Sequence, residues 1–308
     1  MTRVVFFGNE RLISGLEKTE APILKGLIER GYEVVAIVSH HSHTNSRNKR
    51  ALEVAAIAEK HDIPVYLPNK PSEIIDELKG LNAEIAVLAA YGRIISQKVI
   101  DIFPMGIINI HPSLLPKYRG PTPIESALLN GDSETGVSIM KLTAGMDEGP
   151  VFAQATVAIE DSEEKFHLYK KIVDASTQLF FEVFPKIIDG SLQPTPQDAD
   201  QATYSKLIDK TDSVVDWNKP AIRIVNEIRA YAGWPQSKTT LGDVDVIITK
   251  AHVSDEKLDP GTIAVSGTEK LVVGAAEKSV AIDSIKPLGK KEMPVSAFLV
   301  GYGARLKD

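Results

Sequence analysis

The chain has 308 residues, and 35 Lys and Arg against 41 Asp and Glu give a formal net charge of −6. Hydrophobic residues make up 43% and charged residues 25%, which is typical of folded globular proteins and excludes a largely disordered chain. Cysteine is absent, no apolar run approaches a membrane span, and the opening residues show no export signal; we therefore expect a cytoplasmic protein without disulfides or a membrane partner.

Strand-like and helix-like segments alternate over the first third of the sequence. Apolar runs predict strands, and amphipathic spacing predicts helices. The predicted strands are 3–7, 33–38, 84–89 and 106–110, and the predicted helices are 21–30, 51–61 and 72–78. This order indicates an α/β domain with a Rossmann-like, parallel-rich sheet covered on both faces. Ligands of such sheets bind beyond the carboxyl ends of the strands.

The pattern changes in the second half. A helix is predicted at 166–188, and residues 190–204 are polar, contain prolines and lack periodicity, so we interpret them as a linker. A helix at 218–231 is followed by short strands at 237–241, 244–252, 261–265, 270–273 and 279–285. This spacing predicts a small OB-like β-barrel. The predicted division is an N-terminal domain at 1–189, the linker at 190–204 and a C-terminal domain at 205–308.

Several common catalytic signatures are absent. The first strand ends in Gly8-Asn9-Glu10 and the next glycine is Gly15, so the dinucleotide-binding fingerprint is missing. The phosphate loop and the HExxH motif are missing too. Three histidines between residues 40 and 43 are interpreted as a polar loop, because no carboxylate or fourth ligand is paired with them. These observations argue against a dehydrogenase, a kinase or a metalloprotease, and we expect no metal.

A candidate site lies at the end of the strand at 106–110. Alternation along a strand puts Asn109 and His111 on the same face, and Pro112 ends the strand directly after them. A second candidate is a glycine-flanked loop that contains Asp147 and Glu148. Either carboxylate could orient the imidazole of His111, and the spacing alone does not choose between them.

Two long stretches carry a resemblance to a known family. INIHPSLLPKYRG at 108–120 and GVSIMKLTAGMDEGPVFAQ at 136–154 closely resemble the folate-dependent formyltransferase superfamily. The resemblance implies that Asn109, His111 and Asp147 are catalytic. It also implies a set of residues that contact the folate: Ser113, Leu114, Leu115, Pro116, Leu88, Tyr91 and Gly92. No covalent intermediate is needed, which agrees with the lack of a nucleophilic cysteine.

The resemblance extends into the C-terminal part. The segments 215–217, 234–235 and 287–291 are similar to the C-terminal domain of the branch that formylates methionyl-tRNA. It implies transfer of the formyl group of 10-formyltetrahydrofolate to the methionine of initiator methionyl-tRNA in translation initiation, by a monomer. An amino-sugar N-formyltransferase that acts on a nucleotide-linked sugar is the alternative with the same chemistry. A non-catalytic RNA-binding protein would be expected to have lost Asn109, His111 or Asp147, and all three are present.

An acidic protein that binds tRNA must do so through local basic surface. The candidates are Arg47, Lys49, Arg50, Lys206, Lys210, Lys290 and Lys291. The first three follow the second predicted strand, where the family typically has a loop rich in Pro, Gly, Arg and Lys. The basic residues are kept here and the glycine-rich pattern is not. We expect these seven residues to bind the tRNA, and a solvated charge cluster is the alternative.

Overall fold

The computed structural model describes residues 1–13, 19–40 and 52–306. The chain forms two compact units. The first unit comprises Met1–Pro123, Glu134–Ala158 and Tyr169–Ser205, and the second comprises Ile124–Ser133, Ile159–Leu168 and Lys206–Asp308. The residues predicted as a linker, 190–204, therefore belong to the first unit, and two short segments of the predicted N-terminal domain belong to the second. The division at 1–189 and 205–308 stays a prediction.

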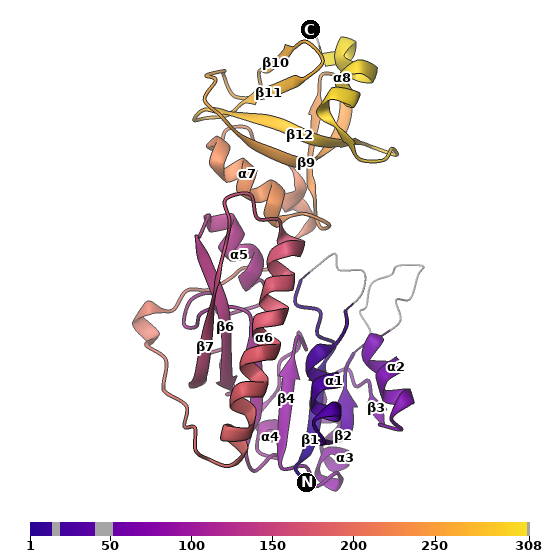
Figure 1. Cartoon of the computed structure of the whole chain (residues 1–308), viewed down its shortest axis with the longest axis vertical. Helices are drawn as coiled ribbons and strands as arrows, with labels where there is room; N and C mark the ends of the chain where they lie inside the picture. Colours follow the sequence, from indigo (N-terminus) through magenta and orange to yellow (C-terminus); the bar gives the residue numbers. More distant parts are fainter. Residues whose placement is uncertain (14–18, 41–51, 307–308) are drawn as a thin grey trace. The chain divides into compact units, whose positions relative to one another are not determined.

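A seven-stranded sheet forms the centre of the first unit (Figure 1). Its strands are β1 (Arg3–Gly8), β2 (Glu33–Val38), β3 (Val65–Tyr66), β4 (Ile85–Ala89), β5 (Ile107–His111), β6 (Glu134–Lys141) and β7 (Val151–Ala158). They pair in the order β3-β2-β1-β4-β5-β6-β7. The strands from β3 to β5 pair in parallel, and β6 and β7 are antiparallel. The predicted parallel-rich sheet is confirmed.

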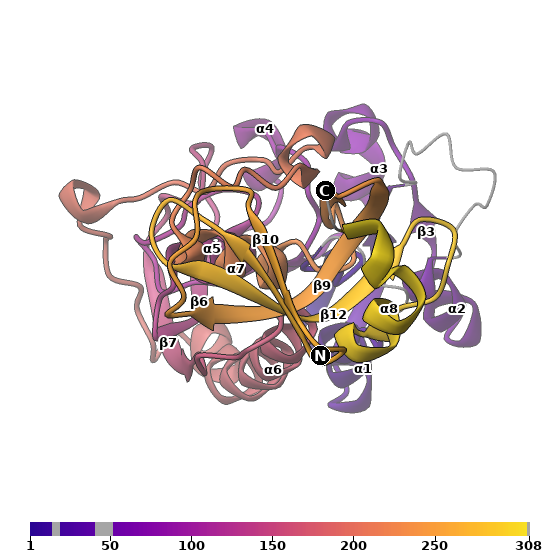
Figure 2. The same ribbon diagram turned by 90° about the horizontal axis from the view of Figure 1, so that it is seen from above.

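Helices cover both faces of this sheet, and Figure 2 shows α1 and α6 on one side and α3 and α4 on the other. The first unit holds α1 (Pro22–Glu29), α2 (Glu53–Lys60), α3 (Ile75–Gly80), α4 (Gln97–Ile100) and most of α6 (Lys165–Ile188), with the 3-10 turns Pro71–Ile74 and Ala199–Gln201. Gly26 of α1 lies so close to α6 that an added Cβ would be 2.4 Å from the ring of Phe181. On the face of the sheet opposite α1 and α6, Phe7 and other residues at alternate strand positions pack with Tyr91 and Phe103.

The second unit is built on an antiparallel sheet in the order β10-β11-β12-β9-β8, with β13 paired to β12. Its elements are α5 (Pro123–Asn130) apart from its first residue, α7 (Ala221–Ala230), β8 (Ser237–Leu241), β9 (Val244–Ser254), β10 (Ile263–Ser266), β11 (Lys270–Gly274), β12 (Ser279–Pro287), β13 (Met293–Pro294), α8 (Val295–Tyr302) and the 3-10 turns Lys210–Ser213 and Gly303–Leu306. Ile224 and Ile228 of α7 and Phe298 of α8 are buried with the sheet in one core. An antiparallel C-terminal domain is thus confirmed.

Most predicted elements match the observed ones closely. The four predicted strands of the first unit end within one residue of β1, β2, β4 and β5. The helix predicted at 72–78 is instead a 3-10 turn, Pro71–Ile74, followed by α3. Pro71 explains the early start, because its fixed φ suits the first turn of a helix. The short elements α4, α5, β3, β13 and α8 were not predicted.

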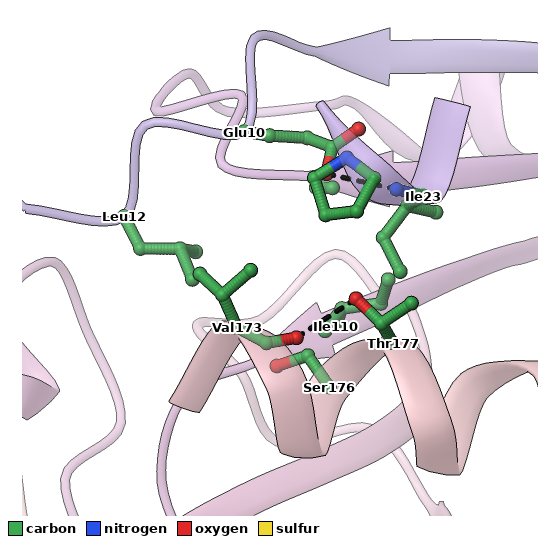
Figure 3. A pocket seen from close by; sticks show the side chains of 9 residues that line it. Glu10, Leu12, Ile23, Ile110, Val173, Ser176 and Thr177 are labelled. Carbon is green, nitrogen blue, oxygen red and sulfur yellow. Dashed lines mark hydrogen bonds between the residues drawn. The ribbon is translucent and has the colours of Figure 1, made fainter. Parts of the chain in front are cut away.

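Glu10 follows β1 and lies at the N-terminus of α1 (Figure 3). Its carboxylate accepts hydrogen bonds from the backbone N–H groups of Ile23 at 3.1 Å and Leu24 at 2.9 Å. The side chain is almost fully buried and lines an apolar pocket that Ile110 also borders. Burial raises the pKa of Glu10 to about 7 from 4.5, although the two backbone donors and Lys25 oppose this shift.

This pKa gives a prediction for stability. The folded-state pKa of Glu10 lies above the unfolded value, so the folded protein binds this proton more tightly. The resulting contribution to the free energy of unfolding is fully present below the unfolded pKa and is lost as the pH rises through about 7. Between about pH 5.5 and about pH 8.5 the free energy of unfolding should fall by about 2 kcal/mol more in the wild type than in Glu10→Gln. Urea unfolding, monitored by far-ultraviolet circular dichroism at the two pH values, measures this free energy for both proteins. An identical pH dependence of the two proteins would contradict the prediction.

Candidate active site

Asn109 and His111 lie on the same face of β5, as alternation along the strand predicts. Both side chains are about 5% exposed. Leu88 of β4 is the register partner of Asn109, and Ser138 of β6 is the partner of His111. The site therefore lies at the carboxyl end of β5, between a parallel and an antiparallel neighbour. Ile110, between the two, borders the Glu10 pocket on the other side of the strand.

Asp147 lies on the loop between β6 and β7 and meets both side chains. Its Oδ1 is 3.5 Å from Nδ2 of Asn109, which donates to it, and its Oδ2 is 3.7 Å from Nδ1 of His111. Oδ2 also accepts a hydrogen bond of 2.8 Å from the backbone N–H of Gly120. The backbone of Asp147 has a φ of 48°, a left-handed conformation that is uncommon outside glycine and is held by surrounding contacts. Glu148, the competing carboxylate, is exposed.

The environment of His111 fixes the roles of its ring nitrogens. Nε2 lies 2.9 Å from the backbone carbonyl oxygen of Tyr118. A carbonyl oxygen only accepts, so Nε2 carries a proton in both the neutral and the charged ring. Nδ1 is then the nitrogen that faces the carboxylate of Asp147.

The predicted folate segment, Ser113 to Pro116, is held by two side chains from β6 and β7. The hydroxyl of Ser138 donates to the carbonyl of Ser113 at 2.7 Å and accepts from the N–H of Leu115 at 3.0 Å. Nε2 of Gln154 donates to the carbonyl of Leu115 and to the hydroxyl of Ser138, each at 2.8 Å. The backbone after β5 is thereby fixed relative to His111.

The other predicted folate residues follow β4. Leu88 and Tyr91 are buried, and Gly92 has a φ of 68°, which permits a tight turn. Nε2 of His40, at the end of β2, donates to the carbonyl of Tyr91 at 2.7 Å. His40 is thus a structural contact of this turn. Residues 41 and 43 lie outside the described residues, and within 1–13, 19–40 and 52–306 no group of three His, Cys, Asp or Glu could hold a metal ion.

The predicted tRNA residues are only partly described. Lys206, Lys210, Lys290 and Lys291 are exposed and belong to the second unit. Arg47, Lys49 and Arg50 lie outside the described residues. No helix within residues 1–13, 19–40 and 52–306 has the length and apolarity to cross a membrane.

Two residues next to the site were not predicted from the sequence. Gln197 bonds the backbone of the Asp147 loop, and Arg119 bonds Gln197. Gln197 lies in the segment interpreted as a linker. The prolines at 194 and 196 restrict the backbone of this segment, because proline limits both its own φ and the preceding residue, but they carry no signal of where the segment docks.

Two family models match the chain. Residues 3–184 match the family "Formyl transferase", and residues 207–303 match "Formyl transferase, C-terminal domain". A methionyl-tRNA formyltransferase of Geobacter sulfurreducens is 32% identical over 99% of this chain and 97% of its own length. A methionyl-tRNA formyltransferase of Chloroflexus aurantiacus is 36% identical over 91% of this chain and 93% of its own length.

Solved structures share the fold at lower identity. An N-formyltransferase from Helicobacter canadensis, in complex with folinic acid and dTDP-3-aminofucose, has a TM-score of 0.71 at 18% identity and covers 93% of this chain and 100% of its own. HypX from Aquifex aeolicus with tetrahydrofolic acid has a TM-score of 0.64 at 19% identity, over 99% of this chain and 47% of its own. At these identities the two similarities show a shared fold and no more.

Proposed function

The chain belongs to the formyl transferase family, and we propose that it transfers the formyl group of 10-formyltetrahydrofolate to the α-amino group of methionine on initiator methionyl-tRNA. The observation that carries the proposal is the convergence of Asn109, His111 and Asp147 at the end of β5. The identities of 32% and 36% to methionyl-tRNA formyltransferases over nearly the whole chain favour this acceptor.

The proposed reaction begins with attack of the neutral amine nitrogen on the formyl carbon. An α-amino group has a reference pKa of about 7.7 to 8.0, so a neutral fraction is present near neutral pH. The new C–N bond converts the formyl oxygen into an oxyanion. The amine then loses a proton, the bond between the formyl carbon and N10 breaks, and N10 takes up a proton.

Asn109 and His111 are the donors for the oxyanion. The side-chain N–H groups of Asn109 and the imidazole of His111 lie on one face of β5. Both side chains are buried, and the low dielectric around them strengthens their interaction with a developing charge. Asp147 completes the site: it holds the ring by charge and accepts the amine proton through a water molecule.

The surroundings suit a folate as the formyl donor. Buried apolar residues flank Asn109 in the sheet: Leu88 of β4 and Met140 of β6 are its register partners. Flat heteroaromatic groups bind between apolar walls, with a few polar groups to orient them. The fixed backbone at 113–116 supplies carbonyl and N–H groups for that purpose.

An amino-sugar acceptor is the competing proposal. The Helicobacter canadensis structure spans 93% of this chain, so possession of a C-terminal domain does not by itself separate the two acceptors. The higher identity to methionyl-tRNA formyltransferases is the observation that favours tRNA.

The experiment that tests the reaction follows both products. Purified protein is incubated with 10-formyltetrahydrofolate and charged initiator tRNA, and tetrahydrofolate and formyl-methionine are quantified. We expect the two in equal amounts, with no formyl-methionine when the folate is omitted. Absence of formyl-methionine with active donor and charged tRNA would overturn the proposal.

The basic residues after β2 give a prediction for tRNA binding. Replacing Arg47, Lys49 and Arg50 together with Ala should raise KM for charged tRNA and leave KM for the folate nearly unchanged. If each residue meets a phosphate, the slope of log KM against log salt should fall by about two to three units. Steady-state kinetics at several salt concentrations measures this.

A matched control uses basic residues at the opposite edge of the sheet. Lys60 and Lys79 are exposed residues in the last turns of α2 and α3, which precede β3 and β4. Their double Ala variant should keep the tRNA kinetics of the wild type. If the triple and the double variant have the same KM for charged tRNA, the basic residues after β2 are a solvated cluster. The amino-sugar acceptor would then be the favoured one.

A further inference from the structure

The side chain of Gln197 joins two loops at the site. Its Nε2 donates to the carbonyl oxygens of Asp147 and Gly149, each at 2.7 Å. Its Oε1 accepts from Nε of Arg119 at 3.1 Å and from Nη2 at 2.9 Å. One amide therefore bridges the loop that carries Asp147 and the loop that follows the predicted folate segment.

The partners leave a single orientation for this amide. Two carbonyl oxygens require the NH₂ group, and a guanidinium requires the oxygen. Both N–H groups of Gln197 are used. Glutamate has nearly the same size and would still accept from Arg119, but it has no hydrogen to donate to the carbonyl groups.

The Asp147 loop depends on such contacts. Asp147 has a left-handed backbone with a φ of 48°, which costs about 1–3 kcal/mol and persists only when neighbours enforce it. The N–H of Gly120 holds its carboxylate, and Gln197 holds its carbonyl. Gly149 packs so tightly that an added Cβ would be 1.9 Å from the carbonyl oxygen of Lys141. Backbone contacts therefore hold both the carboxylate of Asp147 and the loop two residues after it.

We propose that Gln197 is a positioning residue for formyl transfer, which holds Asp147 in place beside Asn109 and His111. The proposal rests on the proposed function of those three residues. Gln197 lies 50 residues beyond Asp147 in the sequence and contacts its backbone alone. It touches neither reacting group, and it acts through the position of the carboxylate.

Arg119 makes the two functions of Gln197 separable. Arg119 is 4% exposed. Its guanidinium belongs to none of the ion pairs of the described residues, and besides Gln197 it contacts the hydroxyl of Tyr204 at 3.4 Å. A buried cation that loses its acceptor destabilises the fold. A carboxylate at 197 retains that acceptor, and a thioether does not.

The segment around Gln197 is anchored independently of its side chain. Val151 and Thr195 exchange two backbone hydrogen bonds of 2.8 Å. The N–H of Arg119 donates to Thr203, and that of Ser205 donates to Arg119, each at 2.8 Å. A substitution at 197 should therefore leave the segment docked and release only the Asp147 loop.

The test compares Gln197→Glu with Gln197→Met in the full-length protein, with Gln193→Met as the matched control. Gln193 is exposed in the same segment and donates only to the carbonyl of Gly190. Both variants at 197 should lower kcat about 10- to 100-fold, because a shift of about 1 Å in a catalytic group costs that much. KM for 10-formyltetrahydrofolate should stay within about threefold of the wild type. Gln193→Met should resemble the wild type.

The melting temperature separates positioning from a purely structural role. Gln197→Glu should keep the Tm of the wild type within a few degrees, and Gln197→Met should lose more, since only glutamate pairs with Arg119. A kcat near that of the wild type in either variant overturns the proposal. A loss of kcat that is large only in the variant with the lowered Tm overturns it too. Inactivity of the wild type itself would instead refute the proposed function.

A crystal structure of Gln197→Met gives a readout that does not need activity. We expect Asp147 to leave the left-handed region and its carboxylate to move away from Nδ1 of His111. An unchanged Asp147 in that structure would overturn the positioning role whatever the acceptor is.

Discussion

His111→Ala and Asn109→Ala should each lower kcat for formyl transfer by about 10²- to 10³-fold, which is the usual cost of removing one donor to an oxyanion. Each change removes a donor from the face of β5 where the formyl oxygen becomes charged. The ground-state carbonyl needs these donors less than the transition state does, so KM for both substrates should change much less than kcat.

Folding must be separated from chemistry in these variants. His111 and Asn109 are buried, and loss of the imidazole also leaves the carbonyl of Tyr118 without its donor. Thermal unfolding of each variant is therefore measured alongside its kinetics. Ile110→Val is the matched control, because Ile110 lies between the two residues and borders the pocket on the other side of β5. A folded His111→Ala or Asn109→Ala with the kcat of the wild type would remove that residue from the mechanism.

Asp147→Asn should be far more damaging than Glu148→Gln. Both carboxylate oxygens of Asp147 act as acceptors, one for Asn109 and one for Gly120. An amide accepts on one oxygen only, so its NH₂ group would face another donor whichever way it turns. It also lacks the charge that holds the His111 ring.

We expect kcat of Asp147→Asn to fall by about 10²-fold or more, as for loss of an orienting carboxylate in other histidine-containing sites. Glu148→Gln should stay within about threefold of the wild type, because Glu148 is exposed. Single-turnover formyl transfer measures both rates. If the Glu148 variant is the one that fails, the two carboxylates have exchanged roles.

The first sheet could be predicted because its strands are short, continuous apolar runs. Strands at 3–7, 33–38, 84–89 and 106–110 were recognisable for that reason, and alternation alone put Asn109 and His111 on one face. The helix α8 was not predicted, because Val295–Tyr302 is apolar almost throughout and shows no helical periodicity. The strand β3 has only two residues, too few to show a pattern.

The rest of the site depends on long-range contacts. Spacing could not choose between Asp147 and Glu148, and the choice came from the resemblance; the structure separates them by burial and by the N–H of Gly120. Gln197 meets Arg119, which is 78 residues away in the sequence. No local pattern encodes such a contact. A polar segment with two prolines resembles a linker until its docking partner is known.

The acceptor is the central claim, and a competition assay measures it most directly. Wild-type protein, limiting 10-formyltetrahydrofolate, charged initiator tRNA and a dTDP-linked amino sugar are mixed, and the formylated products are quantified to give the ratio of kcat/KM values. We predict that formyl-methionyl-tRNA dominates by about 10³-fold or more, because a site that pairs with one acceptor leaves its polar groups unsatisfied with the other. Preferential formylation of the amino sugar would contradict the account.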